Sequence, residues 1–313
     1  MIVCCGEAVI DFLPRISAEG ASVYEPLNGG SIFNTSIAIG RLGLAAGFFG
    51  GISSDFFGDG LIAALKASGV SLKYTKVWDH PSTLAFVKLD QGHARYSFFD
   101  DNSAGRMLTR KDLPKLGPDV RALHFGSFSL TTEPSGSTYE ALLTREAKRR
   151  VICLDPNIRV TLIKDRKRHL ARLNRLIKRC DILKISDEDV EWMTGKRDLA
   201  AVARKWLRAG AKIVVITRGG DGVAGFTRRF SLTLPSVKVK VADTVGAGDT
   251  FTAGLLAAMS KAKLLDKASL AQISQDDLQT ALSFAARAAA ITVSRPGADP
   301  PWAREMEIGN PSS

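Results

Sequence analysis

Asp249 follows directly on two closely spaced glycines, in residues 243–251, which read Asp-Thr-Val-Gly-Ala-Gly-Asp-Thr-Phe. The next residues, 252–259, form a small, apolar run that is typical of a buried helix. Gly246 and Gly248 carry no Cβ, so an anion could approach the backbone N–H groups that are free at a helix N-terminus. Asp249 beside that anion suits proton removal from a hydroxyl, and the N–H groups suit the charge of a transferring phosphoryl group. The spacing alone fits an ordinary helix start as well, with Asp249 as a capping carboxylate.

Strands and helices alternate along most of the chain and would position this carboxylate. Residues 232–241 are predicted as a strand, so the expected local order is strand, glycine turn, helix. Short apolar runs without alternation indicate strands buried on both faces of a parallel sheet. They lie at residues 2–5, 45–50, 120–125, 151–154, 181–185 and 212–217. Helical patterns lie at residues 35–42, 56–68, 137–150, 199–209, 252–259 and 278–293.

A second group of strands interrupts this alternation. Residues 9–13, 21–27, 74–78, 83–89 and 94–99 alternate weakly between apolar and polar side chains, as in a small, half-exposed sheet. Gln91 and Gly92 would form the hairpin turn between the last two strands. We predict that residues of about 12–28 and 73–105 form a lid over the site, because water competes with a hydroxyl for a phosphoryl group.

Length and cysteine usage limit the class of protein. The 313 residues are predicted to form one domain, 1–313. Its four cysteines are scattered, without metal-ligand spacing or a redox pair, which indicates a reducing, cytoplasmic setting. The N-terminus lacks the pattern of a signal peptide, and no apolar run approaches about 18 residues, so no membrane association is expected.

The formal net charge of +11 raises the alternative of a non-catalytic, nucleic-acid-binding protein. Much of the positive charge lies between Arg145 and Arg179. Leu170, Leu173 and Leu176 recur there at helical spacing, so the cations are interpreted as the solvated face of an amphipathic helix. We therefore expect no nucleic-acid partner. The oligomeric state stays open, with a homodimer among the alternatives.

Two stretches resemble the signatures of a known family. Residues 243–251 are similar to the C-terminal signature of the ribokinase family, the phosphofructokinase-B type of sugar kinase. Residues 29–34, Gly-Gly-Ser-Ile-Phe-Asn, resemble its N-terminal signature in the fructokinase-like form. The resemblance covers nearly the full length of the chain. It implies a ribokinase-like α/β fold, in which helices flank a mostly parallel central sheet and a small β-sheet forms a lid.

The resemblance also implies catalytic roles and an ATP-dependent reaction. Asp249 would be the general base, and the backbone of Gly246, Ala247 and Gly248 would form the anion hole. Mg²⁺ would bridge the phosphates of ATP. Residues 155–159, Asp-Pro-Asn-Ile-Arg, resemble a segment that faces the phosphates and the sugar, which assigns Arg159 to both. The alternative for Arg159 is one more surface cation.

Sugar binding is implied for residues near the N-terminus. Asp11 follows the first predicted strand, where ligands of open α/β sheets bind, and the family uses an Asp at this place to hold sugar hydroxyls. Gly30 and Asn34 would contact the sugar, together with Arg159 and Asp249. The alternative for Asp11 is a solvated carboxylate beside a turn.

Nucleotide contacts are implied for a third stretch. Thr217, Gly219 and Gly222 match the family's Thr-x-Gly-x-x-Gly, which lines the nucleotide. Ala247 and Gly248 of the anion hole would contact it too.

Metal contacts rest on weaker matches. Ser186 and Asp189 stand where many members carry Asn and Glu around the phosphates and magnesium. Ser186 is assigned to the nucleotide, and Asp189 would reach Mg²⁺ through water. A capping box at a helix start explains the same two residues. The loop that contains Asp243 is a candidate for a monovalent cation such as K⁺.

The expected substrate is fructose, converted to fructose 6-phosphate. The alternatives within the family are 2-keto-3-deoxygluconate, ribose and a nucleoside. A substrate with a carboxylate would need cations in the lid, where Arg95 and Arg106 are the candidates beside the apolar and acidic residues 98–101. This composition favours a neutral hexose.

Overall fold

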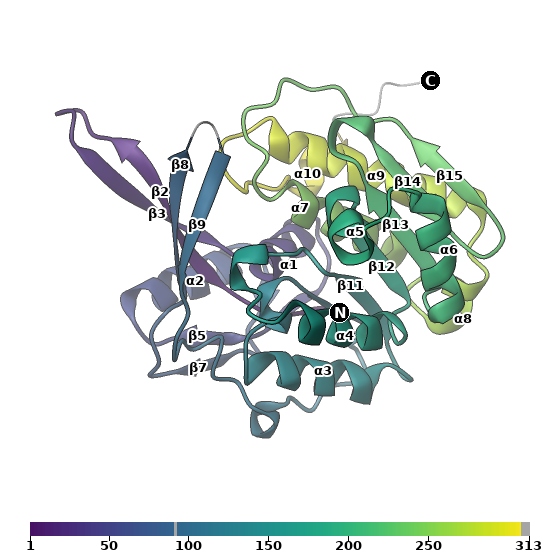
Figure 1. Cartoon of the computed structure of the whole chain (residues 1–313), viewed down its shortest axis with the longest axis horizontal. Helices are drawn as coiled ribbons and strands as arrows, with labels where there is room; N and C mark the ends of the chain where they lie inside the picture. The colour runs from purple at the N-terminus through teal and green to yellow at the C-terminus, as the bar shows by residue number, and fades with distance from the viewer. Residues whose placement is uncertain (91–92, 308–313) are drawn as a thin grey trace.

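The computed structural model describes residues 1–90 and 93–307. Its main body is a nine-stranded sheet (Figure 1). The strands are β1 (Ile2–Cys5), β4 (Ala46–Phe49), β6 (Val70–Ser71), β10 (Ala122–Gly126), β11 (Val151–Asp155), β12 (Ile182–Ser186), β13 (Ile213–Thr217), β14 (Val223–Phe226) and β15 (Ser231–Leu234). Their order is β15-β14-β13-β12-β11-β10-β1-β4-β6. All neighbouring pairs are parallel except β13–β14 and β14–β15, so the prediction of a mostly parallel sheet is confirmed.

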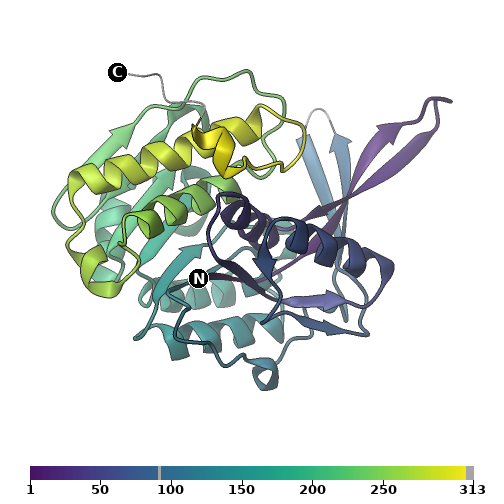
Figure 2. The same cartoon turned by 180° about the vertical axis from the view of Figure 1, so that it is seen from behind.

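Helices cover both faces of this sheet, as the α/β prediction requires (Figures 1 and 2). The face toward the viewer in Figure 1 carries α3 (Ser135–Glu146), α4 (Arg166–Ile177), α5 (Asp187–Thr194) and α6 (Leu199–Ala209). The face toward the viewer in Figure 2 carries α1 (Ser31–Arg41), α2 (Phe56–Ala67), α7 (Ala247–Lys261), α8 (Lys267–Ala271), α9 (Gln275–Val293) and α10 (Ala303–Glu307). Single 3-10 turns are η1 (Arg110–Asp112), η2 (Phe128–Leu130), η3 (Val160–Leu162) and η4 (Gly219–Asp221). Within residues 1–90 and 93–307, no helix combines the length and apolar content needed to cross a membrane.

Strand β1 explains why the central strands form unbroken apolar runs in the sequence. Ile2 and Cys4 pack into the core under α1, α7 and α9, whereas Val3 and Cys5 pack into the core under α3 and α4. All four side chains are at most 2% exposed. Because both faces are covered in this way, the carboxyl edge of the sheet is where polar side chains can gather around a ligand.

A separate four-stranded sheet lies beside the main body. Its strands are β2 (Val9–Ile16), β3 (Ser22–Gly29), β8 (Leu84–Asp90) and β9 (His93–Phe99), in the order β3-β2-β8-β9. Figure 1 shows β2 and β3 projecting away from the helices. The rings of Phe12 and Phe86 stack with centroids 4.5 Å apart and join β2 to β8. The predicted hairpin turn at Gln91 and Gly92 lies outside the described residues.

One predicted strand of this small sheet belongs elsewhere. Residues 74–78 contain β7 (Lys76–Trp78), which pairs with β5 (Gly51–Ser53) as a two-stranded sheet. Alternation along the chain could not distinguish the two locations, because a short half-exposed strand has the same pattern in either sheet.

The strand predicted over residues 232–241 is wrong beyond Leu234. Residues 235–246 form no strand, and the helix is therefore preceded by a loop. Val237, Val239 and Val241 are 43%, 39% and 59% exposed. Their high β-propensity finds no partner strand here, and Pro235 offers no N–H to extend the ladder.

The basic helix α4 is amphipathic, but one of its cations is not solvated. Arg172 is 5% exposed and donates hydrogen bonds to the carboxylates of Glu133 and Glu140 and to the carbonyl of Leu130. The sequence interpretation of this residue as part of a solvated face is wrong, because two acidic partners from the α3 region lie within its reach.

Helix α7 is fixed from two sides. It packs against α1 and against α9. A Cβ placed on Gly254 of α7 would lie 2.8 Å from the Cα of Ala285 in α9, so the glycine permits this close helix contact. The start of α7, which carries Asp249, is therefore held rigidly against α1, which carries Asn34.

Candidate functional site

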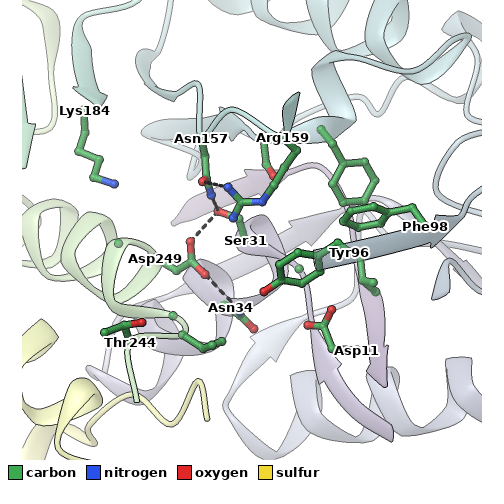
Figure 3. A pocket seen from close by; sticks show the side chains of 17 residues that line it. Asp11, Ser31, Asn34, Tyr96, Phe98, Asn157, Arg159, Lys184, Thr244 and Asp249 are labelled. Atoms are coloured by element: carbon green, nitrogen blue, oxygen red, sulfur yellow. Dashed lines mark hydrogen bonds between the residues drawn. The ribbon is translucent and has the colours of Figure 1, made fainter. Parts of the chain in front are cut away.

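A cavity of about 290 Å³ lies between the carboxyl edge of the main sheet and the small sheet. Its walls come from β2, β9, η2, the start of α1, the segment after β11 and the start of α7. Five predicted residues line it, namely Asp11, Gly30, Asn34, Arg159 and Asp249, together with Gly246 and Gly248 of the predicted anion hole. Figure 3 shows the labelled side chains converging on one space.

Asp249 lies in the first turn of α7 and is 8% exposed. Gly246 precedes the helix with φ 76°, and a Cβ there would come within 2.6 Å of Ala298 Cβ, so only glycine fits. Gly246 has no side chain to cap the helix, and the first N–H groups of any helix lack partners within it. These N–H groups and the helix dipole provide a place for an anion beside Asp249.

Two donors from α1 hold the Asp249 carboxylate. The Ser31 hydroxyl donates to Oδ1 at 2.6 Å, and the Asn34 amide donates to Oδ2 at 3.0 Å (Figure 3). Burial raises the pKa of Asp249, whereas these hydrogen bonds and the charge of Lys184 lower it. The carboxylate lies in a nearly dry place, with a stronger affinity for a proton than an exposed Asp has.

Asn157 links Ser31 to Arg159. The Asn157 amide donates to the Ser31 hydroxyl at 2.8 Å, and Arg159 donates to the Asn157 carbonyl oxygen at 2.6 Å. Asn157 has φ 40°, in the left-handed region, where Asn is the side chain best tolerated after glycine. This backbone turn aims both side chains of the segment into the cavity.

Asp11 occupies the opposite wall, on β2. A Cβ on Gly29 would lie 2.1 Å from Asp11 Oδ2, so the glycine at this position leaves room for the carboxylate. Burial, with a smaller contribution from the charge of Asp249, raises the pKa of Asp11 to about 6, although Arg159 acts in the opposite direction.

A buried ion pair lies behind the anion site. Lys184 Nζ is 2.8 Å from Asp155 Oδ2, and both side chains are almost inaccessible. Burial alone would lower the pKa of Lys184, but Asp155 and further carboxylates outweigh it and raise the pKa, so the amine is charged. A Cβ on Gly248 would lie 3.1 Å from Lys184 Nζ, which places the ammonium group directly against the anion hole.

Aromatic rings of the small sheet close one side of the cavity. Tyr96 and Phe98 of β9 and Phe128 of η2 line it, and the rings of Phe98 and Phe128 lie 5.4 Å apart. Rings in this position can cover an apolar face of a ligand and exclude water.

A second cavity, of about 230 Å³, meets the first at Gly248, which lines both. Its walls include the predicted nucleotide residues Thr217, Gly219 and Gly222, and Ala247. Its other side is apolar, with Val237, Phe251 and the small residues Ala286, Ala289 and Ala290 of α9. An apolar wall beside glycine-rich backbone suits a purine base.

Ser186 and Asp189 lie outside both cavity walls. The Ser186 hydroxyl accepts from the Asp189 N–H at 3.1 Å and caps α5. The Asp189 carboxylate accepts from the Ile158 N–H at 3.3 Å, and burial, followed by the charge of Asp155, raises its pKa to about 6. Both residues therefore have a structural use, and no cluster of three metal-binding side chains occurs among the described residues.

Asp243 and the lid cations complete the predicted positions. Asp243 accepts from the backbone N–H groups of Val245 and Gly297, at 3.0 and 2.9 Å, and so ties the loop before α7 to the loop after α9. Arg106 forms an ion pair with Asp101 and does not line the sugar-sized cavity. The side chain of Arg95 lies outside what the structure describes.

Ser31, Asn157 and Lys184 take part in the polar contacts of the site but were not selected from the sequence. Ser31 follows the selected Gly30, and Asn157 lies within the selected stretch 155–159, so proximity was the available signal. For Lys184 the sequence offers a clearer signal, because this residue is the single charge in the apolar run Ile182–Ile185. A lysine at the centre of a predicted buried strand needs a buried carboxylate partner.

Comparisons with known proteins agree with this geometry. Residues 1–304 match the model of the pfkB family of carbohydrate kinases. The chain is 51% identical over 279 residues to a fructokinase of Rhizobium leguminosarum bv. trifolii, covering 89% of this chain and 86% of the relative. A crystal structure of fructokinase with bound ATP from Xylella fastidiosa superposes with a TM-score of 0.90, at 27% identity, over 98% of this chain and 97% of that one.

A double-mutant fructokinase of Vibrio cholerae O395, in a form with bound fructose, ADP and potassium ion, superposes with a TM-score of 0.84. It is 25% identical and covers 95% of this chain and 93% of its own. The family match extends over almost the whole sequence and includes every segment that builds the two cavities. This chain therefore belongs to the pfkB family of carbohydrate kinases.

Proposed function

We propose that the protein transfers the γ-phosphoryl group of ATP to fructose and forms fructose 6-phosphate. One observation carries the proposal: Gly248 lines both the sugar-sized cavity and the purine-sized cavity, and Asp249, the next residue, lines the first. A hydroxyl in the first cavity and a phosphate chain from the second would come together there. The names of the Rhizobium and Xylella relatives support fructose as the acceptor and ATP as the donor.

Asp249 is assigned the proton. Its Oδ1 and Oδ2 each keep a lone pair for the substrate hydroxyl, since Ser31 and Asn34 use one each. Burial raises the pKa of this carboxylate, so it accepts the proton more readily as the oxygen attacks phosphorus. Asp11 and Asn34 would orient the sugar, with Gly30 leaving space for it.

Phosphoryl charge is assigned to three sources. The N–H groups of residues 246–248 would bind the equatorial oxygens, Lys184 would neutralise them from behind, and Arg159 from the sugar side. Lys184 needs Asp155 to hold it there, because a lysine side chain has four rotatable bonds. Phosphoryl transfer depends almost entirely on such positioning and charge.

Mg²⁺ would neutralise the ATP phosphates, mainly through phosphate oxygens and water, as this ion prefers. Asp189 is the candidate to hold one of these waters, and Ser186 the candidate for a nucleotide contact. Asp243, in the loop that joins the two cavities, remains our candidate for K⁺, and the potassium-containing Vibrio structure supports it.

The other sugars of the family fit less well. A substrate with a carboxylate would need further cations in the cavity wall. Among the described lining residues the cations are Arg159 and Lys184, and Arg106 lies outside the wall, paired with Asp101. A neutral hexose matches the acid and amide groups and the aromatic rings.

A cytoplasmic location accords with four unpaired, buried cysteines. The homodimer and the absence of a nucleic-acid partner remain predictions.

The substrate can be tested with a panel of sugars in a coupled assay of ADP release. We expect kcat/KM for fructose to exceed that for ribose, glucose and 2-keto-3-deoxygluconate by at least about tenfold, since a site built for specific hydroxyls leaves buried polar groups unpaired with other sugars. A higher kcat/KM for any other member of the panel would overturn the choice of fructose. A lack of ADP release with every sugar would overturn the reaction itself.

The role of Lys184 predicts a selective loss of turnover. Lys184→Met should lower kcat by about 10²- to 10³-fold, as loss of one stabilising donor does elsewhere, with little change in KM for fructose. Lys212→Met is the matched control, because Lys212 also pairs with a buried carboxylate, Asp181 at 3.1 Å, but lies outside both cavities. Both variants should melt at lower temperature, and only the first should lose turnover in its folded state. Equal kcat values for the two variants would contradict the assignment.

The raised pKa of Asp11 predicts an acid limb in sugar use. As pH falls through about 6, Asp11 becomes protonated and loses its negative charge and part of its capacity to accept from sugar hydroxyls, so kcat/KM for fructose should fall. Asp11→Asn should lower this parameter at neutral pH and remove that step of the profile. Because the folded pKa lies above the unfolded value of 3.8, protonation of this group favours the folded state between pH 6 and 4. Protonation of Asp11 would therefore not lower kcat/KM by unfolding the protein. If the acid limb of the pH profile were unchanged in Asp11→Asn, the assignment of Asp11 to the sugar would be contradicted.

A further inference from the structure

Three hydrogen bonds in series connect Arg159 to the Asp249 carboxylate (Figure 3). Arg159 donates to the Asn157 carbonyl oxygen at 2.6 Å, and the Asn157 amide donates to the Ser31 hydroxyl oxygen at 2.8 Å. The Ser31 hydroxyl in turn donates to Asp249 Oδ1 at 2.6 Å. The proposed reaction employs the cation and the carboxylate at the two ends of this series. The two middle residues determine how those ends affect each other.

The direction of each hydrogen bond in the series is fixed by the one before it. A side-chain amide has one acceptor and one donor group, so Asn157 turns its N–H groups toward Ser31 while Arg159 occupies its carbonyl oxygen. A hydroxyl has a single proton, and because the Ser31 oxygen accepts from Asn157, that proton goes to Asp249. Hydrogen bonds in series polarise and strengthen one another. The charge of Arg159 therefore helps to stabilise the negative charge of Asp249 from a distance.

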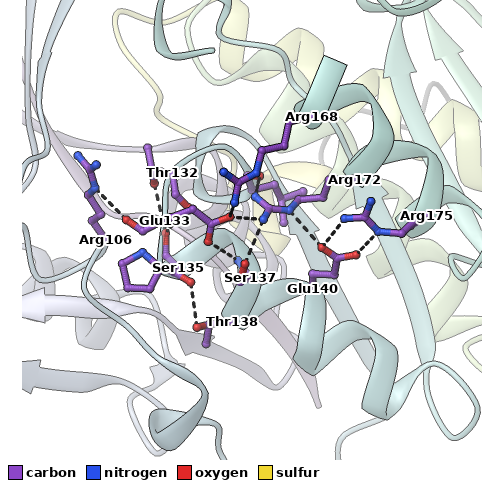
Figure 4. A network of polar contacts seen from close by, with 12 residues as sticks. Arg106, Thr132, Glu133, Ser135, Ser137, Thr138, Glu140, Arg168, Arg172 and Arg175 are labelled. Atoms are coloured by element: carbon purple, nitrogen blue, oxygen red, sulfur yellow. Dashed lines mark hydrogen bonds and ion pairs between the residues drawn. The ribbon is translucent and has the colours of Figure 1, made fainter. Parts of the chain in front are cut away.

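Arg159 is the member of the series that a ligand can draw away. It lines the sugar-sized cavity, and among residues 1–90 and 93–307 its partners are Asn157 and one backbone carbonyl oxygen at 3.3 Å, with no carboxylate. Arg172 is a contrast, because the carboxylates of Glu133 and Glu140 hold its guanidinium in the scaffold (Figure 4). A phosphate is a charged acceptor and binds an arginine more strongly than a neutral amide does. Phosphate binding would therefore weaken the contact between Arg159 and Asn157.

We propose that Asn157 and Ser31 form a relay that makes Asp249 the stronger base when a phosphate binds the arginine. Without a phosphate, every donor of the series points toward the carboxylate and holds its negative charge. Once the arginine turns to the phosphate, the Asn157 amide loses its polarising cation, and Ser31 donates less strongly. Both are positioning residues, which act on the substrate through Asp249. The relay rests on the proposed reaction, and it gives a reason why the base gains strength only when the phosphoryl donor is in place.

Other groups that face Asp249 do not belong to the relay. Burial raises the pKa of Asp249, whereas its hydrogen bonds and the charge of Lys184 on β12 lower it. One of these hydrogen bonds comes from Asn34 of α1, which donates to Oδ2. The charge of Asp155 on β11 raises the pKa, and Asp11 of β2 lies in another wall of the same cavity. Because these groups act with or without the relay, variants must be compared with one another.

Titration of the Asp249 carboxyl by carbon-13 NMR tests the relay. The full-length protein is labelled at the aspartate carboxyl carbons, the Asp249 signal is the one missing in Asp249→Asn, and no fructose is added. Asn157→Gly removes the amide and suits the φ of 40° at this position. We expect Asn157→Gly and Ser31→Ala each to raise the pKa of Asp249, because each weakens or removes a donor to the carboxylate. The double variant should titrate like Ser31→Ala alone.

Addition of adenylyl imidodiphosphate, an ATP analogue that is not hydrolysed, tests the coupling to phosphate. Its charge raises the pKa of Asp249 directly in every variant. In the wild type the relay adds to this rise, so the rise should be larger there than in Asn157→Gly or Ser31→Ala. Thr35→Val is the matched control, because Thr35 also lies beside Asp249 and donates to its backbone oxygen at 3.4 Å but is outside the relay. This variant should titrate like the wild type.

An unchanged pKa of Asp249 in Asn157→Gly would overturn the relay, since a purely structural role would lower only the melting temperature. Additive shifts in the double variant would overturn it too, because they would show that the two residues act separately. Equal rises with the analogue in the wild type and Asn157→Gly would overturn the coupling. If Asn157→Gly does not fold, Ser31→Ala carries the same comparison. No sugar is phosphorylated in these titrations, so failure of the relay is distinguishable from failure of the proposed reaction, which the ADP-release assay detects.

Discussion

A buried carboxylate that needs hydrogen-bond donors in place of water is the constraint on which this structure depends. Asp249 is 8% exposed, and moving its charge out of water is costly unless donors replace the solvent. Ser31 and Asn34 supply those donors at 2.6 and 3.0 Å. The result is a buried carboxylate with a raised pKa, fixed in direction, beside a helix N-terminus that could hold an anion.

The fold can be understood as the means of bringing those donors to one carboxylate. Ser31 and Asn34 come from α1, Asp249 from α7, and Asn157 from the end of β11, more than a hundred residues from α1. Parallel strands place the carboxyl ends of β1, β11 and β12 at one edge, and the packing of α7 against α1 and α9 sets the remaining distance. Lys184 extends the arrangement from β12, where Asp155 of the neighbouring strand holds it.

Sequence reasoning predicted those features that depend on local pattern. Unbroken apolar runs predicted the buried parallel strands, and the glycine turn before Asp249 predicted the start of a helix, observed as α7. Sequence reasoning failed where the structure of a segment depends on partners that are distant in the sequence. The valines at 237, 239 and 241 resemble a strand but have no neighbour to pair with, and Arg172 resembles a surface cation but meets Glu133 and Glu140. Ser31, Asn157 and Lys184 were missed for the same reason, because each acts through a residue far away in the sequence.

The small sheet supplies aromatic rings to one side of the site. Tyr96 and Phe98 come from β9 and, together with Phe128 of η2, give this otherwise mostly polar cavity an apolar side.

The central claim, that Asp249 is the base, is tested most directly by Asp249→Asn. Asn has the same size and caps a helix as well as Asp does, but it takes up no proton at neutral pH. Turnover with ATP and fructose and the melting temperature are measured on the same preparation. Our account predicts that turnover falls by about 10²- to 10⁴-fold, while ATP binding and the melting temperature stay near those of the wild type. Turnover close to wild type would show that Asp249 merely caps α7, and would contradict the account.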